Sequence, residues 1–543
     1  MLISPTSTDV SAASTRQTSG PTISLVVSSV FSPKCLQIPF LEISFLRKVT
    51  RRLSYPLRLW NGSLSENASR LGFLKKLYPL LEKGHTRHIA LVALATITHH
   101  GGSQVHTEIP KHTPILVRLM RENTSDAKLL ELAIVTISHA VQATLVVEKP
   151  PDPKVVKLIG LKDMLDVVLN SIRYPWISAL AVTHAIPLLT SPTLHCWDVV
   201  LKHPDLLNFL AACFRCEDLS VRCDAMSTFF RLHHHDAKED TTVLDPRRVL
   251  ESHERGAFRR PRIEDAIVDY GFQDTDIFNT ILAARTFQSA MQKAVETRNL
   301  VDLGRTLARL VVQTEFSITD GYYQAINERT GRMETVNTGL PFTRWKDALP
   351  PCAEALQETG YASDIDMADI LQIKFFIMTR KLKEAIVRAK AAIERSPHIP
   401  YFYYPIALKA DMEEGLRYAK KGMQCKATTK FVHFGMMKRA IEFAGNLGIN
   451  AVVNPQSVTG GKELGIAFLT SAMEDAKDFI TNAPPDSRHM QEVVDWYMLL
   501  TITLKGPELH MSMIDFTVSI VDAFERQILK LSLSPLAIIA RIG

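Results

Sequence analysis

The chain has 543 residues, 46% of them hydrophobic and 22% charged, which is typical of an ordered protein with room for two or three domains. The formal charge is +6, but residues 1–60 hold seven Lys or Arg and two acids, so the rest carries only about +1, which argues against nucleic acid as a partner. The seven cysteines are irregularly spaced, which predicts reduced thiols inside a cell, in the cytoplasm or the nucleus. No run of about 18 uninterrupted apolar residues occurs, so no membrane-spanning helix is predicted.

Residues 1–62 are rich in Ser, Thr and Pro and then carry a basic piece from Arg47 to Arg58. Transit peptides share this Arg-rich, acid-poor composition, but here the basic piece comes late and no apolar helical face accompanies it. We interpret 1–62 as a disordered or low-complexity leader, with a wrongly assigned translation start or a targeting segment as the alternatives.

A recurring helix motif organises residues 63–235. Residues 93–99 (ALATITH) return 40 positions later at 133–139 (AIVTISH), more loosely from 179 and faintly from 224. This period is typical of armadillo or HEAT repeats, in which two or three helices form each unit. The intervening segments predict partner helices at 71–81, 114–121, 155–169 and 204–214.

The periodicity stops at 236–272, a polar stretch that contains six arginines between Arg247 and Arg262. Without interleaved aromatic residues, a basic linker is a better interpretation than a nucleic-acid site or an import signal. Residues 273–344 then predict helices over 274–310 and a small β-hairpin over 321–336 that Gly331 closes. The expected apolar helix face contains Phe278, Leu282, Phe287, Met291 and Val295.

Residues 345–510 contain two copies of a helical hairpin. Residues 382–393 align with 412–423, and small residues match at Ala385 and Gly415, at Ala389 and Ala419, and at Ala392 and Gly422. Small side chains on one face let two helices pack closely, and stacked pairs of this kind are typical of tetratricopeptide repeats. The offset of 30 residues instead of about 34 predicts shortened turns or helices. Further helices are expected at 431–447, 462–472 and 489–504.

An aromatic segment precedes each copy, at 375–376 and at 401–404, and its bulk is expected to fill the groove beside the small residues. The second segment supplies the candidate protein-contact residues Tyr401, Phe402, Tyr403 and Tyr404. Helical periodicity turns at least two of these four toward the core.

Several segments resemble those of fungal MYND-type zinc-finger proteins: 313–321 (QTEFSITDG), 327–331 (NERTG), 339–342 (GLPF) with Trp345, and 496–503 (WYMLLTIT). The resemblance covers about residues 67–509. It implies a helical scaffold followed by a zinc finger that docks proteins. This chain has no cysteine after Cys425, and its atypical tail, 511–543, does not continue the family pattern. A natural loss of the finger and a truncated gene model both remain open.

No motif predicts catalysis, because nucleophile elbows, phosphate-binding Gly-rich loops and zinc-protease helices are all missing. Cys213, Cys216 and Cys223 precede three histidines at 233–235, but Cys223 falls on an apolar helix face and only half of a zinc site is convincing. His99, His139 and His184 recur at one repeat position, where a structural role is expected, either capping a helix end or satisfying a neighbouring turn.

We therefore predict an all-α superhelix, with armadillo/HEAT-like repeats before tetratricopeptide-like repeats and one small β-hairpin. The expected function is a non-enzymatic protein–protein interaction scaffold without metal, cofactor or small-molecule substrate, whose partners are other proteins or peptides. The alternative is a transcriptional or chromatin-associated adaptor that has lost its zinc finger.

Overall fold

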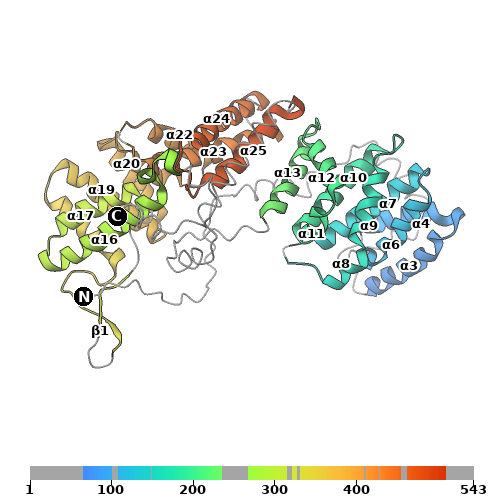
Figure 1. Cartoon of the computed structure of the whole chain (residues 1–543), viewed down its shortest axis with the longest axis horizontal. Coiled ribbons are helices and arrows are strands. Elements are labelled where there is room, and N and C mark those ends of the chain that lie inside the picture. Colours follow the sequence, from blue (N-terminus) through green and yellow to red (C-terminus); the bar gives the residue numbers. More distant parts are fainter. Residues whose placement is uncertain are drawn as a thin grey trace. The chain divides into compact units, whose positions relative to one another are not determined.

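The computed structural model describes residues 65–100, 108–147, 149–234, 267–314, 321–326, 331–408, 411–426, 428–453 and 461–508. Within these ranges the chain is mostly helical, and its one sheet has two strands (Figure 1). The chain divides into two compact units, which contain α3 to α13 and α16 to α25. The predicted all-α class with one small β-hairpin is confirmed. The expected leader (1–62), the six linker arginines and the tail (511–543) lie outside the described residues.

In the amino-terminal unit, the recurring motif falls on α4, α7, α10 and α13, and each of these helices packs against the next (Figure 1). The expected partner segments are also helical, although 155–169 is divided into α8 and α9 by Gly160, whose φ is +66°. The helices are α3 (Ser65–Leu81), α4 (Gly84–His100), α6 (Thr113–Glu122), α7 (Ala127–Leu145), α8 (Pro153–Ile159), α9 (Leu161–Ser171), α10 (Ala179–Thr190), α11 (Trp197–Leu201), α12 (Pro204–Cys213) and α13 (Leu219–His234), with 3-10 turns η2 (Ile109–His112) and η3 (Ser191–Leu194).

Helix α7 is the central helix of this unit. It starts where the Asp126 side chain accepts a hydrogen bond from the Leu129 amide, and Ser138 Oγ donates to the His184 carbonyl of α10 at 2.8 Å. Among the described helices, α7 alone has the length and apolar composition that would let it cross a membrane, but 67% of that stretch is buried inside the unit. The same composition is typical of a core helix that is surrounded by other helices.

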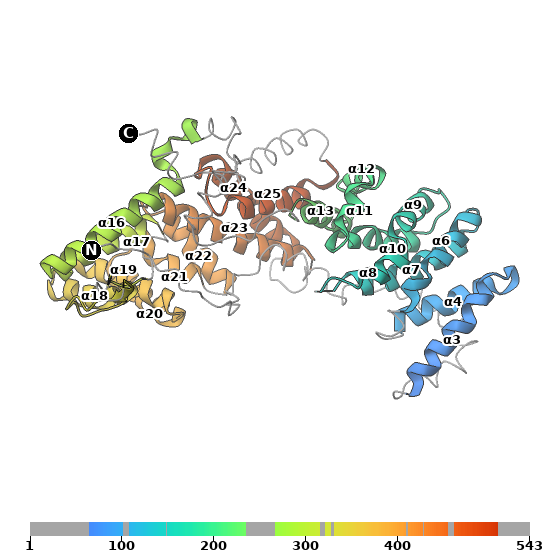
Figure 2. The same cartoon turned by 60° about the horizontal axis from the view of Figure 1, so that its bottom comes forward.

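The carboxyl-terminal unit is a second succession of helices that pack on their sequence neighbours. Helix α23 lies in its middle, with α22 and α24 beside it (Figure 2). Its elements are η4 (Phe272–Asp274), α16 (Asp276–Thr297), α17 (Leu300–Gln313), β1 (Gln324–Ile326), β2 (Met333–Thr335), η6 (Trp345–Ala348), α18 (Leu349–Glu358), α19 (Ala362–Met378), α20 (Leu382–Arg395), η7 (Pro400–Phe402), α21 (Tyr404–Ala407), α22 (Met412–Met423), α23 (Lys430–Val453), α24 (Gly461–Asn482) and α25 (Met490–Lys505); η8 (Gly506–Glu508) follows α25.

The apolar face predicted for α16 is wrong at one residue, Leu282. Phe287 and Met291 are buried as predicted, but Leu282 is 45% exposed and Ala283 takes its place in the core. A step of five residues turns a helix by about 140° beyond a full circle, whereas a step of four stays on the same face. Leu282 therefore points away from the side that Phe287 occupies.

The predicted β-hairpin is confirmed. β1 and β2 are antiparallel, with Ala325 opposite Glu334, and Gly331 between them has a φ of +67°. The base of the hairpin is fixed to the helices, because the Tyr323 hydroxyl donates to the Met291 carbonyl at 3.0 Å and the Trp345 amide donates to the Gly321 carbonyl at 2.9 Å.

The interval expected to be a linker, 236–272, ends in ordered structure. Ile267 is buried, and the Tyr270 hydroxyl donates to the Asn482 carbonyl at the end of α24 at 3.1 Å. Residues 267–272 therefore pack on the carboxyl-terminal unit.

Candidate functional site

The two hairpin copies place their small residues as the sequence predicts. Ala385, Ala389 and Ala392 are the buried residues of α20, and the three matched positions of α22 are also buried. A Cβ atom at Gly415 would lie 2.5 Å from the Phe443 ring, and one at Gly422 would lie 2.3 Å from Met436 Sδ and 2.9 Å from Tyr403 Cβ. Helix α22 therefore packs on α23 and on the aromatic segment without room for larger side chains.

The second copy has a shortened first helix. In the first copy α19 is 17 residues long, whereas in the second copy a three-residue 3-10 turn, η7, leads into a four-residue helix, α21. This shortening explains the offset of 30 residues between the copies. It also places the aromatic segment inside the stack, because η7 and α21 pack between α20 and α22.

Three of the four candidate contact residues are core residues. Tyr401, Phe402 and Tyr403 are 2%, 0% and 6% exposed, and the Tyr403 hydroxyl donates to the Pro397 carbonyl at 2.8 Å. Tyr404 is half-buried, with its ring stacked on that of Tyr401 at 5.9 Å. Tyr401, Phe402 and Tyr403 cannot meet a partner without unfolding the hairpin, so the contact prediction is corrected for these three.

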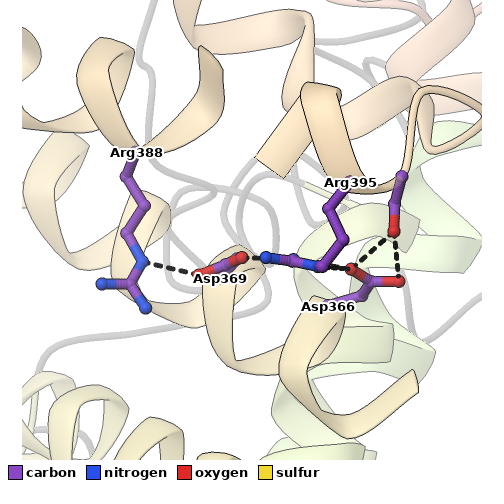
Figure 3. Close-up of polar contacts among 5 residues, drawn as sticks. Asp366, Asp369, Arg388 and Arg395 are labelled. Carbon is purple, nitrogen blue, oxygen red and sulfur yellow. Dashed lines mark hydrogen bonds and ion pairs between the residues drawn. The ribbon is translucent and has the colours of Figure 1, made fainter. Parts of the chain in front are cut away.

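A cluster of charged side chains, which we call the clasp, joins α19 to α20 (Figure 3). Asp369 accepts hydrogen bonds from Arg388 Nε at 2.7 Å and from Arg395 Nη2 at 2.5 Å. Arg395 also reaches Asp366 at 2.7 Å, and Ser396 Oγ donates to the same carboxylate at 2.9 Å. Because both carboxylates are largely buried while the guanidinium groups stay half exposed, the clasp fixes the angle of the first hairpin.

The second hairpin lacks this clasp. The positions 30 residues after Asp366, Asp369, Arg388 and Arg395 hold Ser396, Ile399, Tyr418 and Cys425, none of which forms an ion pair. Charges on α22 are therefore not matched by carboxylates of their own hairpin.

A repeated lysine links the second helix of each hairpin copy to a later helix. Lys390 of α20 pairs with Glu414 of α22 at 2.6 Å, and Lys420 of α22 pairs with Asp475 of α24. The two lysines are equivalent positions of the two copies. Helices α20, α22 and α24 are therefore joined in sequence order by one type of contact.

A buried ion network lies between α23 and α25. Lys438 Nζ contacts Glu442 at 2.8 Å and Glu492 at 3.0 Å, and Arg439 contacts Glu442 at 2.9 Å. Burial raises the pKa of Glu492 to about 7 and raises that of Asp495 well above its ordinary value. Burial also acts on Glu442, but the charges of Lys438 and Arg439 outweigh it and lower the pKa of that carboxyl. Lys438, Arg439, Glu442 and Glu492 bind one another, so the network holds α23 and α25 together.

The cysteines singled out in the sequence lie on α12, on α13 and in the turn between these helices. Among the described residues, no group of three or more His, Cys, Asp or Glu side chains is placed to hold a metal ion. Burial raises the pKa of the Cys213 thiol to about 11 and that of Cys223 to about 12, so both behave as apolar core residues. The side chains at 233–235 lie outside the described residues.

The recurring histidines pack against each other instead of capping helices. The His139 ring of α7 meets the His184 ring of α10 edge-on at 5.1 Å, and His184 Nδ1 lies 2.8 Å from the Leu180 carbonyl oxygen. Both residues lie inside their helices, so neither caps a helix end, and their structural role is packing between α7 and α10. The His99 side chain is not among those described.

The amino-terminal unit has a depression of about 490 Å³ between α8, α9 and α11. Lys157, Lys162, Asp163 and Asp166 contribute charges to its wall. Asp166 pairs with His203 at 2.9 Å, and Asp163 pairs with Arg121. Each of the two acids in its wall therefore has a basic neighbour within the unit.

No family model matches the chain, and neither a curated protein nor a solved structure shows significant similarity to it. The resemblance to MYND-type zinc-finger proteins therefore stays a prediction. Sequence reasoning missed the clasp, the lysine links and the ion network. Only the lysine links had a visible signal, the equivalent placement of Lys390 and Lys420.

Proposed function

We propose that the protein is a non-enzymatic scaffold that binds other proteins through stacked helical repeats, armadillo/HEAT-like in the amino-terminal unit and tetratricopeptide-like in the carboxyl-terminal unit. The observation that carries the proposal is the serial linkage of α20, α22 and α24 through Lys390 and Lys420. A stack in which each hairpin contacts mainly its neighbours presents long outer and inner surfaces to partners.

The packing of the amino-terminal unit supports the same proposal. Its motif helices α4, α7, α10 and α13 lie side by side in sequence order, and their apolar faces form one continuous core. Units that bury their cores only by stacking are typical of repeat proteins, whose usual work is protein binding.

Photo-crosslinking of the full chain tests this function. A benzoylphenylalanine residue would replace Val387, which is 71% exposed on α20, or Arg417, the equivalent residue of α22. We expect the same protein to be trapped from both positions, and an excess of unlabelled full chain to compete for it. A matched probe at Ile326, 52% exposed on β1 and outside both repeat stacks, controls for non-specific capture.

Capture of the same proteins at equal yield from all three positions, or capture that the unlabelled chain does not reduce, would contradict binding through the repeat stack. Capture of a defined protein from the two stack positions alone would support it.

A further inference from the structure

Charge is unevenly distributed along the carboxyl-terminal unit. Residues 346–369 contain six acids and one base, whereas residues 380–426 contain eleven bases and five acids. The near-neutral total of the chain conceals this contrast. It places a basic segment over α20 and α22, the second helices of the two hairpins.

The acids of α19 are used within the unit. Asp364 accepts two hydrogen bonds from Arg305, at 2.9 and 2.8 Å, and Asp366 and Asp369 form the clasp with arginines of α20. These aspartates therefore neutralise arginines and leave the neighbouring lysines unmatched. Six cations have no ion-pair partner among the described residues: Arg380, Lys381, Lys383, Arg417, Lys421 and Lys426.

Several of these cations lie on one face, which we call the α20–α22 surface (Lys383, Val387, Lys390, Arg417, Tyr418 and Lys421). On each helix, Val387 and the basic residues lie on the side opposite the buried small residues, and the half-buried Tyr418 lies at the border of that side. Lys390 Nζ and Lys421 Nζ lie 5.8 and 5.7 Å from the centre of the Tyr418 ring, so the ring joins the two helices. The Tyr418 hydroxyl has no hydrogen-bond partner among the described residues and can donate to an anion.

We propose that the α20–α22 surface binds an acidic peptide segment of a partner protein; this inference rests on the scaffold function proposed above. Carboxylates of the peptide pair with Lys383, Arg417 and Lys421. Val387, which is 71% exposed, contacts an aliphatic side chain between them.

The surface fits a peptide better than a nucleic acid. Tyr418 is its one aromatic side chain, and two ammonium groups and the Tyr403 ring already lie close to its ring, so the surface lacks the series of exposed rings on which successive bases stack. Glu384, Glu394 and Glu413 are exposed among the cations and repel a continuous phosphate backbone. A peptide can place its carboxylates between these glutamates.

Fluorescence anisotropy on the full chain tests the inference. The probe is a labelled twelve-residue peptide of Glu and Asp with one central Leu, and a Gln/Asn version and a thymidine oligonucleotide serve as comparators. We expect Lys383→Gln/Arg417→Gln/Lys421→Gln to weaken binding of the acidic peptide about tenfold, from three exposed charge contacts. Val387→Ser should weaken binding of this acidic peptide but not of a further version in which Glu replaces the central Leu.

The matched control is Lys293→Gln/Lys462→Gln/Lys477→Gln, which removes the same charge from exposed positions on α16 and α24 of the same unit. It should retain wild-type affinity. Equal losses for the two triple variants, unchanged binding by the first, or equal affinity for the oligonucleotide would each overturn the inference. If crosslinking at Val387 and Arg417 traps a protein but the acidic peptide does not bind, the scaffold function stands and this inference falls.

Discussion

Two glycines of the central helix α23 allow a matched test of its packing. A Cβ atom at Gly445 would lie 2.4 Å from the ring of Trp496, which is fully buried on α25, whereas one at Gly435 would meet only the Tyr404 ring at 3.5 Å. Replacing either glycine by Ala improves helix propensity by about 0.8–1.0 kcal/mol. Only Gly445→Ala adds an overpacking cost of about 1–3 kcal/mol, because the Trp496 ring has nowhere to move.

The propensity gain cancels when the two variants are compared, so Gly445→Ala should be less stable than Gly435→Ala by about 2 kcal/mol. Differential scanning calorimetry of the full chain should show the transition of the carboxyl-terminal unit about 4–8 °C lower for Gly445→Ala. Gly435→Ala itself should melt at or above the wild-type temperature. Equal transition temperatures for the two variants would refute the close approach of α25 to α23.

Three further outcomes are expected. Asp369→Asn should lower the free energy of unfolding by about 1–2 kcal/mol in denaturant titration, because it weakens two contacts of a buried carboxylate. The control Lys293→Gln, which removes an exposed pair with Asp302, should change the free energy of unfolding by less than about 0.5 kcal/mol. Equal effects of the two substitutions would contradict a stabilising clasp. Burial raises the pKa of Glu492 from 4.5 to about 7, so stability from this group is full below about pH 4.5 and is lost as the pH rises through 7. Glu492→Gln should thus gain stability relative to wild type between pH 5 and pH 8, and an offset that does not vary with pH would show that Glu492 does not titrate in this range. Native iodoacetamide labelling at pH 8, followed by mass spectrometry, should modify the half-exposed Cys216 before the buried Cys213 and Cys223, whose thiols have raised pKa values; equal rates would show that α12 and α13 open readily.

The sequence predicts the helices best where it repeats. The motif at 93–99 and 133–139 identifies α4 and α7, and the matched small residues identify the buried faces of α20 and α22, because both patterns depend on local periodicity. The division between α8 and α9 escapes prediction, because Gly160 adopts a left-handed conformation inside an otherwise continuous apolar pattern. The sequence also does not predict the short helix α21. Four consecutive aromatic residues cannot show which of them faces the core.

Contacts between helices are harder to predict. Asp369 of α19 contacts Arg388 and Arg395 of the next helix, 19 and 26 positions later. Glu492 contacts Lys438, 54 positions earlier, so in neither case does a short sequence window contain both partners. The lysine links are different. Lys390 and Lys420 are equivalent in the two copies, and their alignment alone would have indicated a shared structural role.

The net charge of the chain is the clearest case in which a whole-chain total hides a local feature of the surface. Outside the first 60 residues the total is about +1, which argues against a charged surface only if positive and negative groups are mixed in space. Here the acids of α19 are buried against Arg305, Arg388 and Arg395, and exposed lysines remain on α20 and α22. A buried carboxylate neutralises its own arginine but screens a distant lysine little, because the field at the surface depends on the nearest charges. A repeat protein can therefore be neutral overall and still offer an acidic segment a basic surface, provided that its acids hold the hairpins together and its lysines do not.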